Sequence, residues 1–492
     1  MTGTGRRPAL DAVIVGAGPN GLAAAVILAR AGLRVEVHEA AATPGGGART
    51  EELTLPGHRH DVCSAVHPMG LASPFFRAFD LAAHGVRMLQ PEVAYAHPLD
   101  GGRAGLAWRD LDRTADGLGV DGRAWRRLLA PLVRAWPGVV GVAMSDLRSP
   151  PPDPITAFAL ARRMVEQGSP LWNLRFRGET APAMLTGVGA HAIAPPRGLA
   201  PAGAGLLLAT LAHAVGWPIP EGGSGSVIAA LVRDLIAHGG RVITGSRIDR
   251  LDQLPPANAV LLDLAPAGLL RLAEAELPSS YVRSLRRFRY GGAACKVDFV
   301  LTGPVPWSAP GCALAGTLHL IGTRAEAVAA ERAVARGVHP DRPYVLAAQP
   351  GVVDSSRAPA GRHTLWTYAH VPNGSGVDVS AAVIAQIERF APGFRDLVAA
   401  TSVRTALDLE RYDANDVGGD IAAGALTLWQ TVARPVPRRD PYATPLDGVY
   451  LCSASTPPGP GVHGMAGLHA ARRVLRARFG IRTDPLRLLR LP

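Results

Sequence analysis

Three glycines stand within six residues near the start of the chain, and their spacing suits the binding of a phosphate. Gly16, Gly18 and Gly21 form the pattern G-x-G-x-x-G, with Pro19 and Asn20 between the second and third glycines. The first glycine permits a tight turn, the second lets a pyrophosphate approach the backbone, and the third lets a helix pack closely on a strand. The motif therefore predicts a dinucleotide at the N-terminus of a helix.

The segments around this motif have the pattern of a strand–helix–strand unit. Residues 12–15 are apolar and predict a strand, residues 22–31 predict a helix, and residues 34–38 predict a second strand. Glu39 follows eighteen residues after Gly21, where a carboxylate accepts hydrogen bonds from the ribose hydroxyls of a dinucleotide. Strand, motif, helix, strand and acid in this order outweigh the alternative, a glycine-rich turn that binds nothing.

Length and composition bound the class of protein. The chain has 492 residues, of which 48% are hydrophobic and 18% are charged, so we expect an ordered protein of two or three domains. No apolar run reaches the ~20 residues of a membrane-spanning helix. The cysteines show neither metal-ligand nor CxxC spacing, so we expect reduced thiols in a cytoplasmic protein. They are Cys63, Cys295, Cys312 and Cys452.

The formal net charge of +11 raises the question of a nucleic-acid partner. The basic residues are dispersed arginines, and Lys296 is the single lysine of the chain. Nucleic-acid binding needs basic residues gathered on one face, so no nucleic-acid partner is expected. A positively charged surface still favours acidic substrates or lipid headgroups.

A second group of glycines follows Glu39. In the stretch AAATPGGGARTEEL, Gly46 and Gly47 precede Arg49. Paired glycines let the backbone close on an anion, and a guanidinium supplies a fork of donors to phosphate oxygens. Here the sequence resembles the FAD-containing family of phytoene desaturases, flavin amine oxidases and their relatives. In that family a second glycine pair and an arginine reach the FAD pyrophosphate, so the resemblance implies FAD as the cofactor.

Two further segments extend the resemblance over nearly the whole chain. Residues 448–475 resemble the closing flavin motif, with a strand at 449–452, a glycine-rich turn and a helix at 467–476. Around position 248, after an expected helix at 226–238 and strand at 241–244, the resemblance places a backbone against the adenine. Ser453 to Ser455 stand where the family often has a glycine and an acid, so the acidic contact is open and backbone contacts are the alternative. The residues implied to bind the cofactor here are Ile248, Ser455, Gly461, Val462 and His463.

These anchors predict an α/β fold in which an FAD-binding Rossmann-like domain of the glutathione reductase type carries an inserted α+β substrate domain. The FAD-binding domain would consist of residues 1–75, 220–290 and 435–492, and the substrate domain of 76–219 and 291–434. The first substrate segment is mainly helical in pattern. The second shows apolar alternation at 296–301 and 344–349, which predicts an antiparallel sheet.

Two residues are candidates for chemistry. The stretch YGGAACKVDF resembles the family segment in which a lysine contacts a water beside flavin N5, which would give Lys296 a catalytic role; the alternative is a surface lysine. His463, in the turn GVHG, would lie near the flavin as a donor, acid or base. The alternative for His463 is a cap on the following helix.

Other polar groups have weaker claims. His60, Asp61 and His67 lack a fourth convergent ligand, so we expect no metal; they would line the route to the site or hold the second glycine loop. Cys452 is expected to be a packed hydrophobe, with a covalent flavin link as the alternative. Trp429 and Gln430 are weak candidates for the pocket wall.

The helix expected at residues 152–167 has Arg162 and Arg163 on its polar side. Because related desaturases meet membranes, a peripheral membrane contact is one interpretation, and a solvated helix face is the other.

The sequence as a whole predicts an FAD-dependent oxidoreductase, a dehydrogenase or desaturase. It would remove a hydride from a C–C or C–N bond of a largely apolar small molecule and pass the electrons to oxygen or a quinone. Two alternatives remain: a flavin amine oxidase, and a non-redox flavin-bearing isomerase or binding module. The sequence leaves the oligomeric state open.

Overall fold

The chain folds around two sheets, and the computed structural model describes residues 10–491. The first sheet has five parallel strands in the order β16-β10-β1-β2-β9. These strands come from three distant parts of the chain, and their bounds are Leu10–Val15 (β1), Val35–His38 (β2), Arg241–Ile243 (β9), Ala257–Leu262 (β10) and Val449–Leu451 (β16). The central strands β1 and β10 are mostly apolar because helices cover both faces of the sheet.

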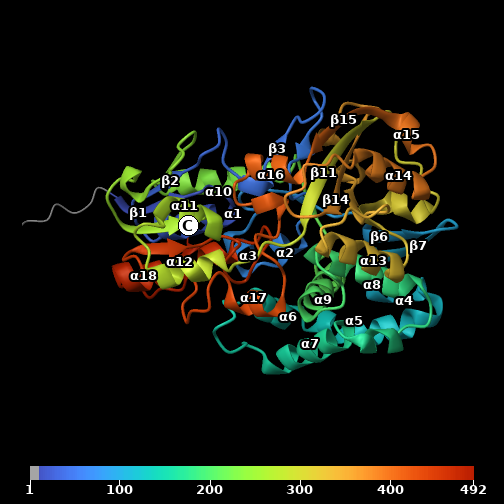
Figure 1. The fold of residues 1–492 in the computed structure, drawn as a ribbon, viewed down its shortest axis with the longest axis horizontal. Helices are drawn as coiled ribbons and strands as arrows, with labels where there is room; N and C mark the ends of the chain where they lie inside the picture. The colour runs from blue at the N-terminus through green and yellow to red at the C-terminus, as the bar shows by residue number, and fades with distance from the viewer. Residues whose placement is uncertain (1–9, 492) are drawn as a thin grey trace, which may run out of the picture.

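Close packing joins the first glycine motif to the end of the chain. A Cβ at Gly467 would lie 2.0 Å from the carbonyl oxygen of Asn20, so α1 and α18 can approach this closely only because position 467 has no side chain. The helices α1, α10 and α18 cover one face of the sheet, and α11 and α12 cover the other (Figure 1). The helices of this part of the molecule are α1 (Pro19–Arg30), α2 (Pro68–Ala72), α3 (Pro74–Phe79), α10 (Gly225–Ala237), α11 (Pro266–Ala273), α12 (Ser279–Arg286), α18 (Met465–Phe479) and α19 (Pro485–Leu488).

The second sheet has seven strands in the order β15-β11-β14-β13-β12-β6-β7, and it is antiparallel except between β12 and β6. One face packs its Val, Leu and Phe side chains against α14 and α15. The bounds are Val93–Leu99 (β6), Arg103–Trp108 (β7), Ala293–Leu301 (β11), Ala315–Leu320 (β12), Val345–Ala348 (β13), His363–Val371 (β14), Val398–Arg404 (β15), Ser380–Phe390 (α14) and Phe394–Leu397 (α15).

A layer of helices lies below this second sheet in Figure 1. At its centre α9 is almost wholly buried and crosses α8 where a Cβ at Gly205 would lie 3.0 Å from the Cα of Gly189. The helices outside the five-stranded sheet are α4 (Leu111–Asp116), α5 (Gly122–Arg134), α6 (Trp136–Ala143), α7 (Pro154–Gln167), α8 (Thr180–Gly189), α9 (Leu199–Ala214), α13 (Arg324–Ala335), α16 (Ala406–Tyr412) and α17 (Leu428–Ala433). Two short pairs complete the fold: β3 (Thr50–Glu51) with β4 (His60–Asp61), and β5 (Met88–Leu89) with β8 (Ile219–Pro220).

The expected fold class is confirmed, because a Rossmann-like parallel sheet carries a second sheet and its helices in long insertions. One feature was not predicted. The mainly helical segment at 76–219 also supplies β6 and β7, so both substrate segments build a single sheet. Among residues 10–491 no helix is long and apolar enough to cross a membrane.

Candidate active site

A cavity of about 820 Å³ is lined by residues that follow the strands of the first sheet and by residues of the second sheet. At one end its wall is made by the loops that follow β1, β2, β9, β10 and β16, at the carboxyl edge of the parallel sheet. Ligands of open α/β sheets bind at this edge. At the other end its wall is made by side chains of α7, α9 and the seven-stranded sheet. Nearly all the residues predicted to bind the cofactor lie in this wall: Gly16, Gly18, Pro19, Asn20, Glu39, Gly46, Gly47, Arg49, Ile248, Ser455, Gly461 and Val462.

The first glycine motif has the geometry that its spacing predicts. Gly16 has a φ of +100°, in the region that favours glycine, and Gly18 caps α1. Gly21 does not line the cavity; a Cβ there would lie 2.1 Å from the carbonyl oxygen of Gly16, so this glycine permits the close turn itself. Glu39 accepts hydrogen bonds from the backbone N–H of Ala17 (2.8 Å) and of Ala41 (2.9 Å), which fixes its carboxylate at the cavity edge.

The second glycine loop faces the first one. A Cβ at Gly46 would lie 3.4 Å from the Cα of Gly18, so both backbones border the same narrow space. Arg49 is buried beside them, with Nη2 at 3.4 Å from a carboxylate oxygen of Glu39. Its Nε has no hydrogen-bond partner within the described chain, and neither has Oδ1 of Asn20. A cradle without side chains and with an unused guanidinium N–H fits a pyrophosphate, whose oxygens accept hydrogen bonds.

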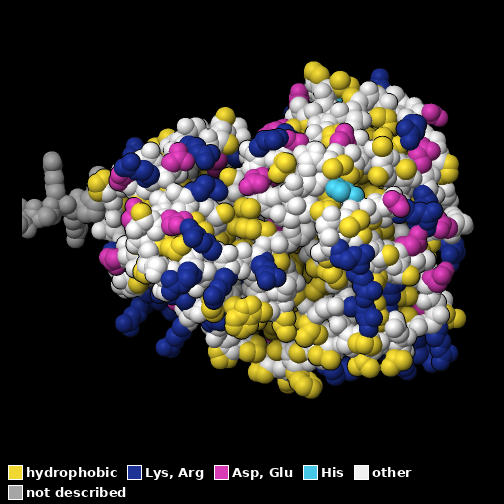
Figure 2. All heavy atoms as spheres, in the orientation of Figure 1, with side chains coloured by type: hydrophobic (Ala, Val, Ile, Leu, Met, Phe, Trp, Pro, Cys, Tyr) yellow, Lys and Arg dark blue, Asp and Glu magenta, His cyan; other side chains and the backbone are white. Residues whose placement is uncertain are grey.

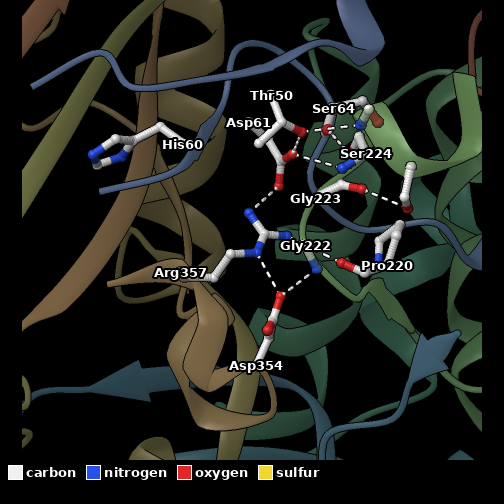
Figure 3. Close-up of polar contacts among 12 residues, drawn as sticks. Thr50, His60, Asp61, Ser64, Pro220, Gly222, Gly223, Ser224, Asp354 and Arg357 are labelled. Atoms are coloured by element: carbon white, nitrogen blue, oxygen red, sulfur yellow. Dashed lines mark hydrogen bonds and ion pairs between the residues drawn. The ribbon is translucent and has the colours of Figure 1, made fainter. Parts of the chain in front are cut away.

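Asp61 fixes the segment that follows the second glycine loop (Figure 3). Its carboxylate accepts hydrogen bonds from the Thr50 hydroxyl (2.7 Å) and the Ser224 N–H (2.7 Å), and it forms an ion pair with Arg357 (2.9 Å). His67 is bonded to Ser224 through Nε2 at 2.7 Å. Among residues 10–491 no group of three or more His, Cys, Asp or Glu side chains is arranged to hold a metal. The stretch therefore ties the glycine loop to the start of α10 and to the other sheet.

Asp263 is a cavity residue that the sequence analysis missed. It ends β10, and its Oδ2 accepts a hydrogen bond from the backbone N–H of Gly21 at 2.9 Å. A Cβ at Gly18 would lie 2.7 Å from the same oxygen. Burial is the main cause that raises the pKa of Asp263 to about 7, with the nearby Asp413 and Glu39 adding to it. A carboxyl group that titrates near neutral pH thus lies next to the expected pyrophosphate cradle.

The structure places His463 outside the cavity wall, a position that favours the helix-capping alternative over the predicted catalytic role. The side chain is fully buried and does not line the cavity. Its Nδ1 accepts a hydrogen bond from the N–H of Met465 at 3.1 Å, and Nε2 lies 3.2 Å from the carbonyl oxygen of Gly459. Burial lowers the pKa of His463 to about 4, so the ring is neutral. His463 therefore caps α18, which is the alternative that its position in the turn allowed.

Lys296 also lies outside the cavity wall. Its ammonium is buried, paired with Asp298 two residues along the same strand, and lies 4.8 Å from the centre of the Trp366 ring. Trp366 and Tyr368, which lie opposite Asp298 and Lys296 in the strand register, do line the cavity. His60 Nδ1 lies 3.4 Å from the same Asp298 oxygen. The ammonium is therefore held in a buried ion pair next to the cavity wall, and its catalytic role stays a prediction.

The structure also places three residues that the sequence singled out with weaker support. Cys452 is fully buried and outside the cavity wall, and burial raises the pKa of its thiol, so it packs as a small hydrophobe; Cys63 is the cysteine that lines the cavity. The cavity is not lined by Trp429 or Gln430, although their neighbours Leu428 and Thr431 do line it.

The helix α7 differs from the expected amphipathic pattern. Arg163 is buried and donates hydrogen bonds to the carbonyl oxygens of Leu128 (2.8 Å) and Ala159 (2.9 Å), because it lies on the face turned to α5. The solvent face carries apolar side chains instead. Figure 2 shows hydrophobic atoms gathered along the lower edge of the molecule, where Figure 1 shows α6, α7 and α17. Exposed apolar residues of α7, α17 and the turn between α7 and α8 are Ile155, Phe158, Val165, Leu171, Leu174, Leu428, Trp429 and Val432.

Comparison with known proteins agrees with this fold. Residues 14–81 match the family model described as an NAD(P)-binding Rossmann-like domain. A rat protein named pyridine nucleotide-disulfide oxidoreductase domain-containing protein 2 is 26% identical, over 96% of this chain and 94% of its own. Among solved structures, putrescine oxidase bound to putrescine has a TM-score of 0.61 at 18% identity, covering 96% of this chain and 99% of the other. Reduced UDP-galactopyranose mutase has a TM-score of 0.54 at 15% identity, covering 98% and 97%. The chain therefore has a fold that oxidases share with a mutase.

Proposed function

We propose that this protein is an FAD-dependent oxidoreductase that removes a hydride from a C–C or C–N bond of a largely apolar small molecule. The observation that carries the proposal is one continuous cavity with two different ends. One end is a cradle of facing glycine loops with Glu39 and Arg49, and the other is walled by apolar side chains. When bound, FAD would supply the two-electron chemistry. The similarity to an oxidoreductase relative and to oxidase structures supports the same class.

The roles of the chain's own residues follow from their positions. Glu39 would accept hydrogen bonds from the ribose, and the glycine loops and Arg49 would hold the pyrophosphate. Ile248, Ser455 and the backbone at 461–462 would complete the cofactor site. Apolar side chains would bind the substrate and exclude water, and these are Leu160, Met164, Leu207, Leu208, Leu346 and Trp366. Oxygen or a quinone would accept the electrons.

The absorption spectrum of the purified protein, before and after precipitation in acid, tests the cofactor. We expect flavin bands whose chromophore moves into the supernatant, because Cys452, the cysteine of the closing motif, is buried outside the cavity wall. A colourless protein that also fails to bind added FAD would overturn the proposal. Bands that stay with the precipitate would show a covalent flavin, and Cys63, the cysteine of the cavity wall, would be the first residue to test for the link.

Two other functions are tested by the fate of the electrons. Putrescine oxidase shares the fold, so an amine oxidase is the second candidate; it would release hydrogen peroxide and a carbonyl compound. UDP-galactopyranose mutase shares the fold too, so a non-redox activity is the third candidate. An oxygen electrode with a substrate screen distinguishes them. Dehydrogenation of a C–C bond consumes an electron acceptor without forming a carbonyl from an amine, and a mutase consumes no acceptor.

We also propose that the exposed apolar edge contacts a lipid surface. Leu160 and Met164 of α7 line the cavity, while Ile155 and Phe158 of the same helix are exposed, so an apolar substrate would have a short route inward. Co-sedimentation with phosphatidylglycerol vesicles should fall for Phe158→Ser. It should stay unchanged for the control Val338→Ser, because Val338 is also exposed but does not belong to α7, α17 or the turn between α7 and α8. Equal loss in both variants, or no binding by the wild type, would contradict this contact.

A further inference from the structure

The face of the seven-stranded sheet that borders the cavity carries several polar side chains. Side chains alternate between the two faces of a strand, so Thr317 and His319 of β12 share one face. The register places Tyr95 of β6 and Ala348 of β13 opposite Thr317 on the neighbouring strands. The other face of the same strands is apolar and packs against α14. Polar groups are thus confined to the side where the cavity lies.

His191, on the turn that follows α8, completes this cluster. Its Nε2 lies 3.0 Å from Nε2 of His319, and its ring is 5.5 Å from that of Trp217. His191, Thr317 and Trp217 line the cavity, whereas His319 and Tyr95 lie behind them. Burial lowers the pKa of His191 to about 3, with His370 adding to the effect. Both rings are therefore neutral at pH 7, and one donates the shared hydrogen bond to the other.

Several polar atoms of the cluster have no partner in the described part of the chain. They are the Thr317 hydroxyl, the Tyr95 hydroxyl and Nδ1 of His319, and their three side chains are more than nine-tenths buried. Buried polar atoms are normally hydrogen-bonded, and those in a cavity wall are commonly satisfied by a ligand or water. Thr317 belongs to the cavity wall, so its hydroxyl is the group placed to meet a ligand.

The charges of the cavity lie elsewhere. Its ionisable Asp, Glu and Arg side chains all belong to the loops after β1, β2, β9 and β10 and to the region of α11 and α16, on the dinucleotide side. They are Glu39, Arg49, Arg247, Asp249, Asp263, Arg271, Arg411, Asp413 and Asp416. The nearby buried charges, Lys296 with Asp298 and His370 with Glu331, are already paired with each other. A carboxylate or ammonium beside His191 and Thr317 would therefore lose its hydration without gaining a countercharge from the cavity wall, which is costly. A hydroxyl or a carbonyl oxygen would gain hydrogen bonds at little cost.

We propose that His191 and Thr317 form a specificity site for an uncharged oxygen group, a hydroxyl or a ketone, at the far end of an otherwise apolar substrate. This inference rests on the proposed function in taking the cavity as the substrate site, and it narrows the substrate to an apolar alcohol or ketone. The same geometry disfavours a diamine such as putrescine, which would place an ammonium at this end.

A matched set of ligands tests the site by direct binding. Isothermal titration calorimetry would use 4-tert-butylcyclohexanol, 4-tert-butylcyclohexanone, the corresponding carboxylate and the corresponding amine, with the protein as purified. The alcohol and the ketone should bind at least ten-fold more tightly than the carboxylate and the amine at pH 7. Tighter binding of either charged compound would overturn the proposal, as would a failure of all four to bind below 5 mM.

Variants locate the contact. Thr317→Val should weaken alcohol binding about ten-fold, and Thr317→Ser should bind like the wild type because it keeps the hydroxyl. His191→Phe should weaken it by a similar factor. Thr364→Val is the matched control, since Thr364 is another buried, unpartnered threonine of the same sheet that does not line the cavity. Equal affinities of all these variants would refute the site.

Flavin content, measured on each sample from its absorption, keeps this test separate from the proposed function. Loss of FAD binding with intact alcohol selectivity would reject the oxidoreductase and keep the site. FAD binding without alcohol selectivity would reject the specificity site and keep the proposed oxidoreductase.

Discussion

The buried pair of Lys296 and Asp298 gives the sharpest prediction. Both side chains are at most 3% exposed, so Lys296→Met leaves a carboxylate in the interior without its cation. Removing one partner of a buried ion pair costs about 3–5 kcal/mol. His60 Nδ1 lies 3.4 Å from Asp298 and has no hydrogen-bond partner among the described residues, so it is placed to donate a hydrogen bond to the carboxylate and offset part of the loss. We therefore expect a destabilisation of about 3 kcal/mol.

This loss converts into a shift of the melting temperature. An unfolding entropy of about 2.1 cal/mol/K per residue gives about 1 kcal/mol/K for the 492 residues, if they unfold together. Lys296→Met should thus lower Tm by about 3 °C in a calorimetric scan. The double variant Lys296→Met/Asp298→Leu should regain most of this, because an apolar pair of similar volume replaces a buried ion pair at little cost.

Flavin reoxidation separates a structural from a chemical role of Lys296. The rate of flavin reoxidation is measured by stopped-flow mixing of the reduced protein with oxygen. Any slower reoxidation of Lys296→Met should come from the unpaired Asp298 carboxylate, which disturbs the neighbouring cavity wall. The double variant should reoxidise within about two-fold of the wild type, because Asp298 holds the ammonium in a buried ion pair and Lys296 is not part of the cavity wall. A double variant that recovers its Tm but reoxidises on the order of 10²-fold more slowly would refute this reasoning and return Lys296 to the chemistry.

Three further predictions concern the dinucleotide end. Gly467→Ala should lower the free energy of unfolding by about 3 kcal/mol or more, and with it the Tm, because its Cβ would meet the Asn20 carbonyl oxygen at 2.0 Å. An unchanged Tm would contradict the contact between α1 and α18. The pKa of Asp263 is raised to about 7, so its carboxyl is mostly neutral at pH 6 and mostly ionised at pH 8. Because the ionised carboxylate would repel the pyrophosphate, FAD affinity should fall up to about ten-fold between pH 6 and pH 8. Binding titrations of Asp263→Asn should show no such fall. Arg49→Met should weaken FAD binding about ten-fold, as measured by flavin fluorescence, and an equal affinity would remove Arg49 from the pyrophosphate site.

The cofactor end of the cavity could be predicted from the sequence because its determinants are local. Gly16, Gly18 and Glu39 lie within 24 residues of one another, and each is needed for the backbone geometry of one strand–turn–helix unit. The resemblance of the second glycine loop extended this interpretation to Arg49, and the resemblance of the closing motif extended it to the last part of the chain, hundreds of residues away. Asp263 escaped it because its contact with Gly21 joins positions 242 residues apart, and no spacing rule links them.

His463 and Lys296 show why a residue type in the right motif does not settle a role. A histidine in a glycine-rich turn before a helix can serve either a ligand or the free N–H groups of the helix, and only the fold decides which. Here the N–H of Met465 donates a hydrogen bond to Nδ1 of His463. For Lys296 the partner is Asp298, two residues along β11. Because residues two apart in a strand share one face, the spacing alone could have predicted this ion pair.

The same period explains how the polar end of the cavity arises from an unremarkable sequence. In β12, Thr317 and His319 alternate with Leu318 and Leu320, and the leucines commit one face to the core against α14. The polar residues must then face the helical layer, where α9 and Trp217 leave a cavity in place of close packing. The arginines and carboxylates of the cavity belong to the loops of the parallel sheet and to residues 411–416, so under the proposed function we expect a substrate to meet charge near the cofactor site and neutral donors at its far end. The division between the two sheets would then set the chemistry of the substrate as well as the position of the cofactor.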